Sequence, residues 1–131
     1  MPRPSPRPVT DPRRALGDRG EQEAADFLSR CGMRILERKF RCRGGEVDLI
    51  ARDGTDLVFV EVKTRTSGQF GEGSEAVTAS KRRRILRAAS LYLSARDSLS
   101  HPCRFDVVSV RLDPSGGPHL EHLRDAFGAD R

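Results

Sequence analysis

The sequence predicts an α/β fold in which a mixed central sheet is flanked by helices on both sides. Three patterns predict this fold: helical spacing of apolar residues over 15–31, two β-branched segments within 45–65, and a helix ending near residue 96 before a strand at 103–112. An alternating segment at residues 33–40 adds a first strand. The order is therefore helix, three strands, helix and strand, which packs as layers around one sheet.

The chain has the length of a single domain, with 131 residues. Residues 1–14 hold five of the eight prolines and four arginines. Such a composition cannot bury enough surface to fold, so we expect a disordered basic tail followed by one domain at residues 15–131. No apolar run approaches the ~20 residues that span a bilayer, and no signal peptide is evident. We therefore expect a cytoplasmic protein without membrane association.

Two adjoining segments form a predicted β-hairpin. Its strands are residues 45–52 and 57–65, with a tight turn between them. A loop at residues 54–55 would set Asp48 opposite Glu61, and a loop one residue earlier would change the partners but keep the charges on one face. The other face is expected to be wholly apolar and consists of Val47, Leu49, Val58, Val60 and Val62.

Charged side chains share the second face of this hairpin: Glu46, Asp48, Glu61, Lys63 and Arg65. Clustered carboxylates destabilise a fold because each raises the cost of ionising the others, so their presence in apolar strands indicates a bound cation. Mg²⁺ prefers carboxylate oxygens and keeps waters for a substrate phosphate. Lys63 would then hold a scissile phosphate or orient the attacking water. The alternative is a solvated sheet face with cross-strand ion pairs.

Basic residues exceed acidic ones by 24 to 19, and the net charge is +5. Four of them form the run KRRR early in the second helix. The first residue of this run, Lys81, lies at the border of the apolar side of the helix and would project toward the carboxylates. The arginines of this run either follow a nucleic-acid backbone or form a solvated face. The candidate backbone contacts are Arg82, Arg83, Arg84, Arg65, and Arg43 in the glycine-rich loop before the hairpin.

Asp48 followed by the Glu-Val-Lys of residues 61–63 resembles the D…(D/E)-x-K signature of the restriction-endonuclease-like superfamily of metal-dependent nucleases. The segments GEVDLIA, LVFVEVKTR, FGEGSEAV and CRFDVVSV, with the basic helix led by Lys81, resemble the YraN-like family, which is assigned to that superfamily. The similarity runs from about residue 16 to the C-terminus. It implies the αβββαβ core of the restriction-endonuclease-like fold.

The resemblance also implies roles for individual residues. Asp48 and Glu61 would hold Mg²⁺ or Mn²⁺, and Glu21, together with Glu46, would bind the ion through water or hold a second one. Nucleases of the superfamily often supply an acidic residue from the first helix, which gives Glu21, with Glu23 as the alternative. Lys81 becomes an auxiliary phosphate contact.

Three functions are therefore weighed. The first is a metal-dependent nuclease that hydrolyses DNA phosphodiester bonds, with branched DNA among the candidate substrates. The second is a non-catalytic nucleic-acid-binding adaptor with the same fold, and the third is a protein-interaction domain. The complete D…E-x-K set favours the first, because a pure binder gains nothing from carboxylates that face phosphates. DNA is the expected partner, and a homodimer is left open.

Other polar residues are given structural or surface roles. Asp106 is expected to pair with a nearby arginine, with a fourth acidic site residue as the alternative. His119 and His122 lack the spacing of a helical zinc motif and are expected at the surface, where residues 119–123 would add an edge strand. The glycine-rich loop at residues 66–74 would form a flap over the site.

Overall fold

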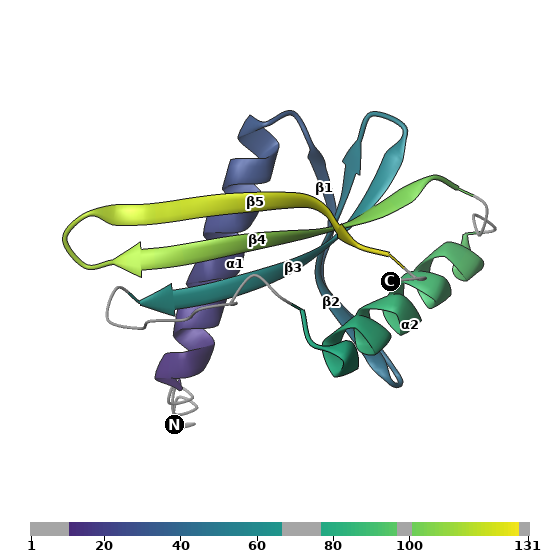
Figure 1. The fold of residues 1–131 in the computed structure, drawn as a ribbon, viewed down its shortest axis with the longest axis horizontal. Coiled ribbons are helices and arrows are strands. Elements are labelled where there is room, and N and C mark those ends of the chain that lie inside the picture. The colour runs from purple at the N-terminus through teal and green to yellow at the C-terminus, as the bar shows by residue number, and fades with distance from the viewer. Residues whose placement is uncertain (1–10, 67–76, 97–100, 129–131) are drawn as a thin grey trace, which may run out of the picture.

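The computed structural model describes residues 11–66, 77–96 and 101–128, so most of the expected flap lies outside the described residues. The chain forms, in order, α1 (Pro12–Arg30), β1 (Arg34–Cys42), β2 (Gly45–Asp53), β3 (Asp56–Thr66), α2 (Ala79–Ala95), β4 (Cys103–Asp113) and β5 (Gly117–Phe127) (Figure 1). The predicted order of elements is confirmed, and the last strand is longer than the expected edge strand. The fold is a mixed α/β fold compatible with a restriction-endonuclease-like core.

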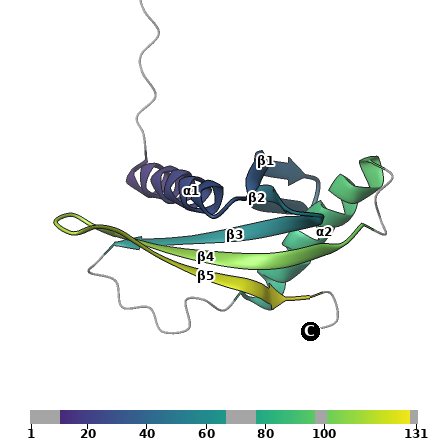
Figure 2. The ribbon, with the colours of Figure 1, turned by 90° about the horizontal axis from the view of Figure 1, so that it is seen from above.

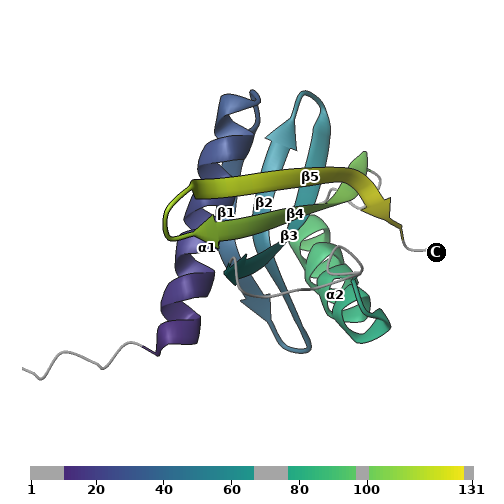
Figure 3. The same ribbon diagram turned by 60° about the vertical axis from the view of Figure 1, so that its left-hand side comes forward.

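One five-stranded sheet organises the molecule, with its strands in sequence order from β1 to β5. Neighbouring strands are antiparallel except β3 and β4, which are parallel because α2 connects them. The two helices cover opposite faces of the sheet, as Figure 2 and Figure 3 show from two sides. No helix in the described part of the chain combines the length and apolar character that crossing a membrane requires.

Helix α1 begins earlier than the sequence predicts. Asp11 caps it by accepting a hydrogen bond of 2.9 Å from the backbone N–H of Arg13, and Pro12 occupies the first turn. Proline is favoured there because its fixed φ suits the helix and its missing N–H would be unpaired anyway. Residues 12–14, which the sequence assigns to the tail, therefore form the start of the helix.

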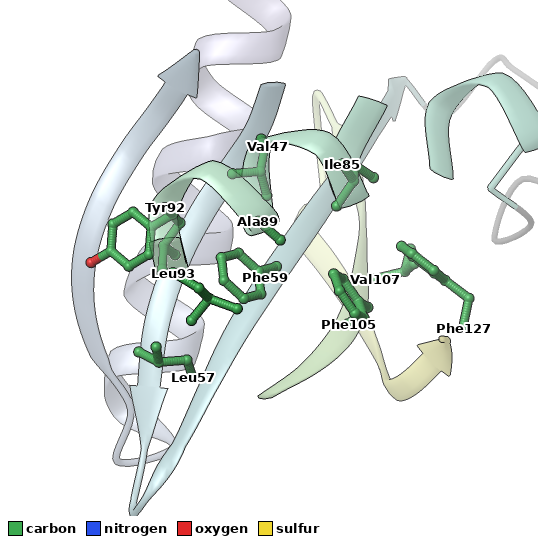
Figure 4. Packing of buried hydrophobic residues seen from close by; sticks show 12 residues of the cluster. Val47, Leu57, Phe59, Ile85, Ala89, Tyr92, Leu93, Phe105, Val107 and Phe127 are labelled. Carbon is green, nitrogen blue, oxygen red and sulfur yellow. The ribbon is translucent and has the colours of Figure 1, made fainter. Parts of the chain in front are cut away.

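Each helix packs on its own apolar layer. On the α1 side, the buried residues are Ala24, Ala25, Leu28, Met33, Leu49, Ala51, Val58, Val60, Val108, Val110 and Leu112. On the α2 side, they are Val47, Ile50, Leu57, Phe59, Ile85, Ala88, Ala89, Tyr92, Leu93, Phe105, Val107 and Phe127, most of which Figure 4 labels. Alternation along β3 and β4 thus sends odd-numbered residues toward α2 and even-numbered residues toward α1.

Strand β2 changes partners along its length. Its pairing with β3 runs from Asp53 opposite Asp56, across the loop at residues 54–55, to Leu49 opposite Val60. Closer to its start, β2 packs against α2, where a Cβ added to Gly45 would lie 2.6 Å from the Arg84 carbonyl oxygen. The prediction of a single apolar face on this hairpin is therefore wrong for one residue. Val47 belongs to the layer that packs on α2, whereas Leu49, Val58, Val60 and Val62 pack on the α1 side.

Candidate functional site

Two carboxylates, those of Asp48 and Glu61, lie side by side beyond the paired part of β2 and β3. Asp48 Oδ2 accepts a hydrogen bond of 2.8 Å from the backbone N–H of Val62, and Glu61 is only 3% exposed. Burial, followed by the hydrogen bond with Glu61 and the charge of Glu61, raises the pKa of Asp48 to about 8, although the Val62 amide opposes the shift. Near neutral pH, and with no cation beside it, this carboxyl therefore keeps its proton.

Lys81 reaches this pair from the first turn of α2. Thr78 caps the helix by accepting a hydrogen bond of 3.1 Å from the Lys81 backbone N–H, and the Lys81 ammonium lies 2.8 Å from Glu61 Oε2. Partial burial disfavours its charge, but Glu61, Asp48 and Glu46 together raise the pKa of Lys81 above its ordinary value. The predicted direction of the Lys81 side chain is confirmed. Its contact with phosphate stays a prediction.

Glu21 approaches the carboxylate pair from α1. It lines the same cavity as Asp48, and its charge adds to the raised pKa of Asp48, whereas the alternative, Glu23, is not among the described residues that line this cavity. The ammonium of Lys39 lies 2.8 Å from Glu21 Oε2 and 2.6 Å from Asp18 Oδ1.

Lys39 holds these acids from β1 with a φ of 50°, in the left-handed region that is uncommon for lysine. Sequence reasoning missed Lys39, because one lysine in an alternating strand gives no sign of a partner on another element.

Two cavities open on either side of the end of β3. The first, of about 350 Å³, is lined by Arg13, Leu16, Gly17, Glu21, Asp48, Val62, Thr64 and Lys81. The second, of about 370 Å³, is lined by Glu61, Val62, Lys63, Thr64, Arg65, Thr78 and Lys81. Lys81 borders both, so the carboxylate pair is accessible from the α1 side and from the α2 side. Arg13, which the sequence assigns to the tail, belongs to the first cavity.

Glu46 faces other partners than the carboxylate pair. Its Oε2 lies 3.5 Å from Nε of Arg41, and its Oε1 lies 3.8 Å from a terminal nitrogen of Arg84. Within the described ranges, no three His, Cys, Asp or Glu side chains gather in a way that could hold a metal ion. The structure thus brings together two of the three carboxylates named for the metal.

The remaining pair has the chemistry that Mg²⁺ or Mn²⁺ requires. Mg²⁺ is commonly bound by one or two carboxylates together with waters and substrate phosphates, which leaves most positions to the solvent. Asp48 and Glu61 offer two such groups, and the cavity beside Asp48 has the volume of roughly twelve water molecules. A cation here would also relieve the repulsion that raises the pKa of Asp48.

The predicted arginines surround this site at different depths. Arg83 and Arg84 are exposed on α2, Arg82 is half-buried on the same helix, and Arg43 is exposed in the turn between β1 and β2. Arg65 is half-buried near the end of β3 and lines the second cavity. Their contacts with nucleic acid stay predictions.

Asp106 is a structural residue, as the sequence predicts. It is fully buried, it lies 3.1 Å from Nε of Arg104, and it accepts a 2.9 Å hydrogen bond from the Asp125 backbone N–H at an irregular point in the β4–β5 pairing. Burial opposes ionisation, but the hydrogen bonds from His122, Arg104 and the Asp125 backbone N–H lower the pKa of Asp106 below its ordinary value.

The surface prediction for His122 is wrong. Its Nε2 lies 2.7 Å from Asp106 Oδ2, and its ring packs edge-on against Phe27 of α1. His119 is exposed, as predicted.

The fold and the site define a class: an α/β protein with a mixed sheet between two helices and a pair of adjacent, largely buried carboxylates beside two cavities that basic residues help to line. The sequence profile described as "Uncharacterised protein family UPF0102" matches residues 20–110, a range that contains Asp48, Glu61 and Lys81. The chain belongs to this family, which confirms the YraN-like resemblance.

Curated relatives match nearly the whole chain. A UPF0102 protein of Symbiobacterium thermophilum is 53% identical over 116 residues, which cover 88% of this chain and 98% of the relative. One of Nocardia farcinica is 50% identical over 115 residues, covering 88% and 91%, and one of Geobacter metallireducens is 48% identical over 114 residues, covering 87% and 93%.

Proposed function

We propose that this protein is a divalent-metal-dependent nuclease that hydrolyses phosphodiester bonds of DNA. The single observation that supports it best is the pair of Asp48 and Glu61, two adjacent carboxylates of which Glu61 is buried and Asp48 is partly buried, and both border open cavities. A structural role would favour a matched polar partner for each carboxylate, as Arg104 and His122 provide for Asp106. Asp48 instead keeps its proton, an arrangement that a divalent cation would replace.

In this proposal, Mg²⁺ or Mn²⁺ supplies positive charge beside the scissile phosphate and lowers the pKa of bound water. The chain has four tasks around it. Asp48 and Glu61 hold the ion, Glu21 orients its waters from the α1 side, and Lys63 stabilises the charge that develops on the phosphate. Lys81 is neutralised by Glu61 in the metal-free protein, and it becomes available to phosphate once the ion takes its place.

A second candidate function rests on the same lysine. The Lys81 ammonium already lies 2.8 Å from Glu61 and so provides part of the positive charge that a metal would bring. A protein that binds nucleic acid without cleaving it would keep this ion pair permanently. This adaptor function differs from the nuclease in one respect that can be measured, the response to divalent metal.

The deciding experiment is cleavage of a panel of linear, single-stranded and branched DNAs in Mg²⁺ or Mn²⁺. Wild type is expected to cleave at least one of them, and Glu61→Gln and Asp48→Asn to lose activity by on the order of 10²-fold or more. Glu23→Gln is the matched control, because it removes a carboxylate of α1 that does not line the cavity, and its activity should be unchanged.

The adaptor would be favoured over the nuclease if wild type binds these DNAs but cleaves none with either metal. If both Glu61→Gln and Asp48→Asn keep their nuclease activity, these two carboxylates are not the catalytic residues.

A further inference from the structure

We propose that a cavity on the β4–β5 hairpin holds a backbone phosphate of the nucleic-acid strand that enters the carboxylate site. The cavity has a volume of about 240 Å³ and is lined by Arg65, Ser109, Val110, Arg111, His119, Leu120 and Glu121. Its lining residues come from β3, β4 and β5, and Figure 1 shows these three strands extending beyond α2. The inference rests on the proposed function in taking nucleic acid as the ligand.

The strand register builds this cavity from three neighbouring strands. Arg65 of β3 lies opposite Arg111 of β4, and Arg111 lies opposite His119 of β5. Odd-numbered residues of β3 and β4 point toward the α2 side, so Arg65 and Arg111 share the face of the sheet that carries Glu61. Three basic-type side chains thus form a row across the sheet.

Arg65 joins this row to the carboxylate site. It lines the cavity on the hairpin and also the cavity that contains Glu61, Lys63 and Lys81. Along β3, Arg65 lies four residues after Glu61, a distance of roughly 13 Å. A strand whose scissile phosphate lies at Glu61 would therefore bring another phosphate, a few nucleotides away, over the hairpin.

The chemistry of the cavity suits a phosphate. Guanidinium groups match phosphate oxygens with two parallel hydrogen bonds, and Arg65 and Arg111 outnumber the one acidic lining residue, Glu121. Arg111 is exposed and has no ion-pair partner among the described residues. The Ser109 hydroxyl is buried without a hydrogen-bond partner in the described structure, so it is a donor that a ligand oxygen would satisfy.

The test is the salt dependence of binding, by fluorescence anisotropy, of a labelled DNA oligonucleotide to the full-length protein without divalent metal. Arg111→Ala is expected to weaken binding and to reduce the slope of log K against log salt by about 0.7–0.9, the value for one lost phosphate contact. Ser109→Ala removes no charge, so it should weaken binding and leave the slope unchanged.

Arg52→Ala is the matched control, because it removes the same charge from an exposed position on β2. Its partner on β3, Leu57, lies eight residues before Arg65, roughly 26 Å along the strand. This variant should bind DNA with nearly the wild-type slope.

The outcomes separate this inference from the proposed function. If Arg111→Ala lowers affinity and slope while Arg52→Ala does not, the phosphate site is supported, even if no DNA in the panel is cleaved. If wild type binds and the two variants behave alike, the phosphate site is overturned, and the nuclease proposal stands or falls with the cleavage assay. If wild type binds no DNA at low salt, the phosphate site is overturned, and the nuclease proposal is again decided by the cleavage assay.

Discussion

Asp48 is the residue whose protonation reports most directly on the site. Burial and the neighbouring Glu61 raise its pKa to about 8, far above that of a carboxyl in an unfolded chain. The folded protein therefore binds this proton more tightly than the unfolded protein does. The stability that results is fully present below about pH 4 and is lost as the pH rises through about 8.

Replacing Asp48 with Asn should remove this pH dependence. Between about pH 5 and pH 8, the unfolding free energy of the metal-free wild type is expected to fall relative to that of Asp48→Asn, by up to ~1.4 kcal/mol per pH unit. Chemical denaturation of both proteins at several pH values measures the difference. Parallel curves would mean that Asp48 is ionised throughout and that the pair does not share a proton.

Asp106 and His122 show how far single residues can be interpreted from sequence. The pattern around Asp106 includes Arg104 two positions away on the same face of a strand, so its partner could be predicted. The role of His122 could not, because its partners, Asp106 and Phe27, come from another strand and from α1. Contacts between residues distant in the chain leave no local pattern.

Helix α1 is placed by one close contact with the sheet. A Cβ added to Gly20 would lie 1.8 Å from Oγ1 of Thr64, so only glycine allows the helix to approach β3 this closely. Glu21 follows directly and lines the cavity that contains Asp48. The position of the acidic residue from α1 therefore depends on the absence of a side chain beside it.

Gly20→Ala should destabilise the protein by about 1–3 kcal/mol through overpacking. Adding Thr64→Ala should recover part of the loss, because the two side chains compete for one space, and a double-mutant cycle from denaturation curves measures that coupling.

Gly17→Ala in the same helix is the control for Gly20→Ala. A Cβ there meets nothing within 4 Å, so this change should stabilise by about 0.5–1 kcal/mol. If Gly20→Ala and Gly17→Ala change the unfolding free energy equally, the close contact between Gly20 and Thr64 does not determine how α1 packs on the sheet.

Strand β2 shows which part of an element depends on packing. The turn and the strand pairing near it follow from local sequence. The sequence leaves two registers possible, and the structure has the one with the loop at residues 54–55. The position of Glu46 did not follow, because the start of β2 packs against α2 through Gly45. That contact places Glu46 beside Arg41 and Arg84 instead of the carboxylate pair.

For the whole molecule, the sequence was sufficient for the order of elements and for the neighbouring positions of Asp48 and Glu61. Both depend on periodicity and on a short hairpin, which are local properties. The cavities on either side of β3 depend on how α1 and α2 pack against the sheet, and the row of Arg65, Arg111 and His119 depends on the parallel β3–β4 register and on the return of β5. Arg13, Lys39 and Arg111 were missed because their neighbours come from other elements.

The most direct test of the metal site is the melting temperature of wild type and Glu61→Gln with and without Mg²⁺, at matched ionic strength. At about a hundred times its dissociation constant, Mg²⁺ should stabilise wild type by roughly 2.7 kcal/mol and leave Glu61→Gln unchanged. Without metal, Glu61→Gln should melt at the same or a higher temperature, because the charge of Glu61 no longer raises the pKa of Asp48 and Lys81, 48% exposed, remains solvated. If Glu61→Gln melts lower and Mg²⁺ shifts neither protein, the pair is a structural ion-pair site and the metal-dependent function is contradicted.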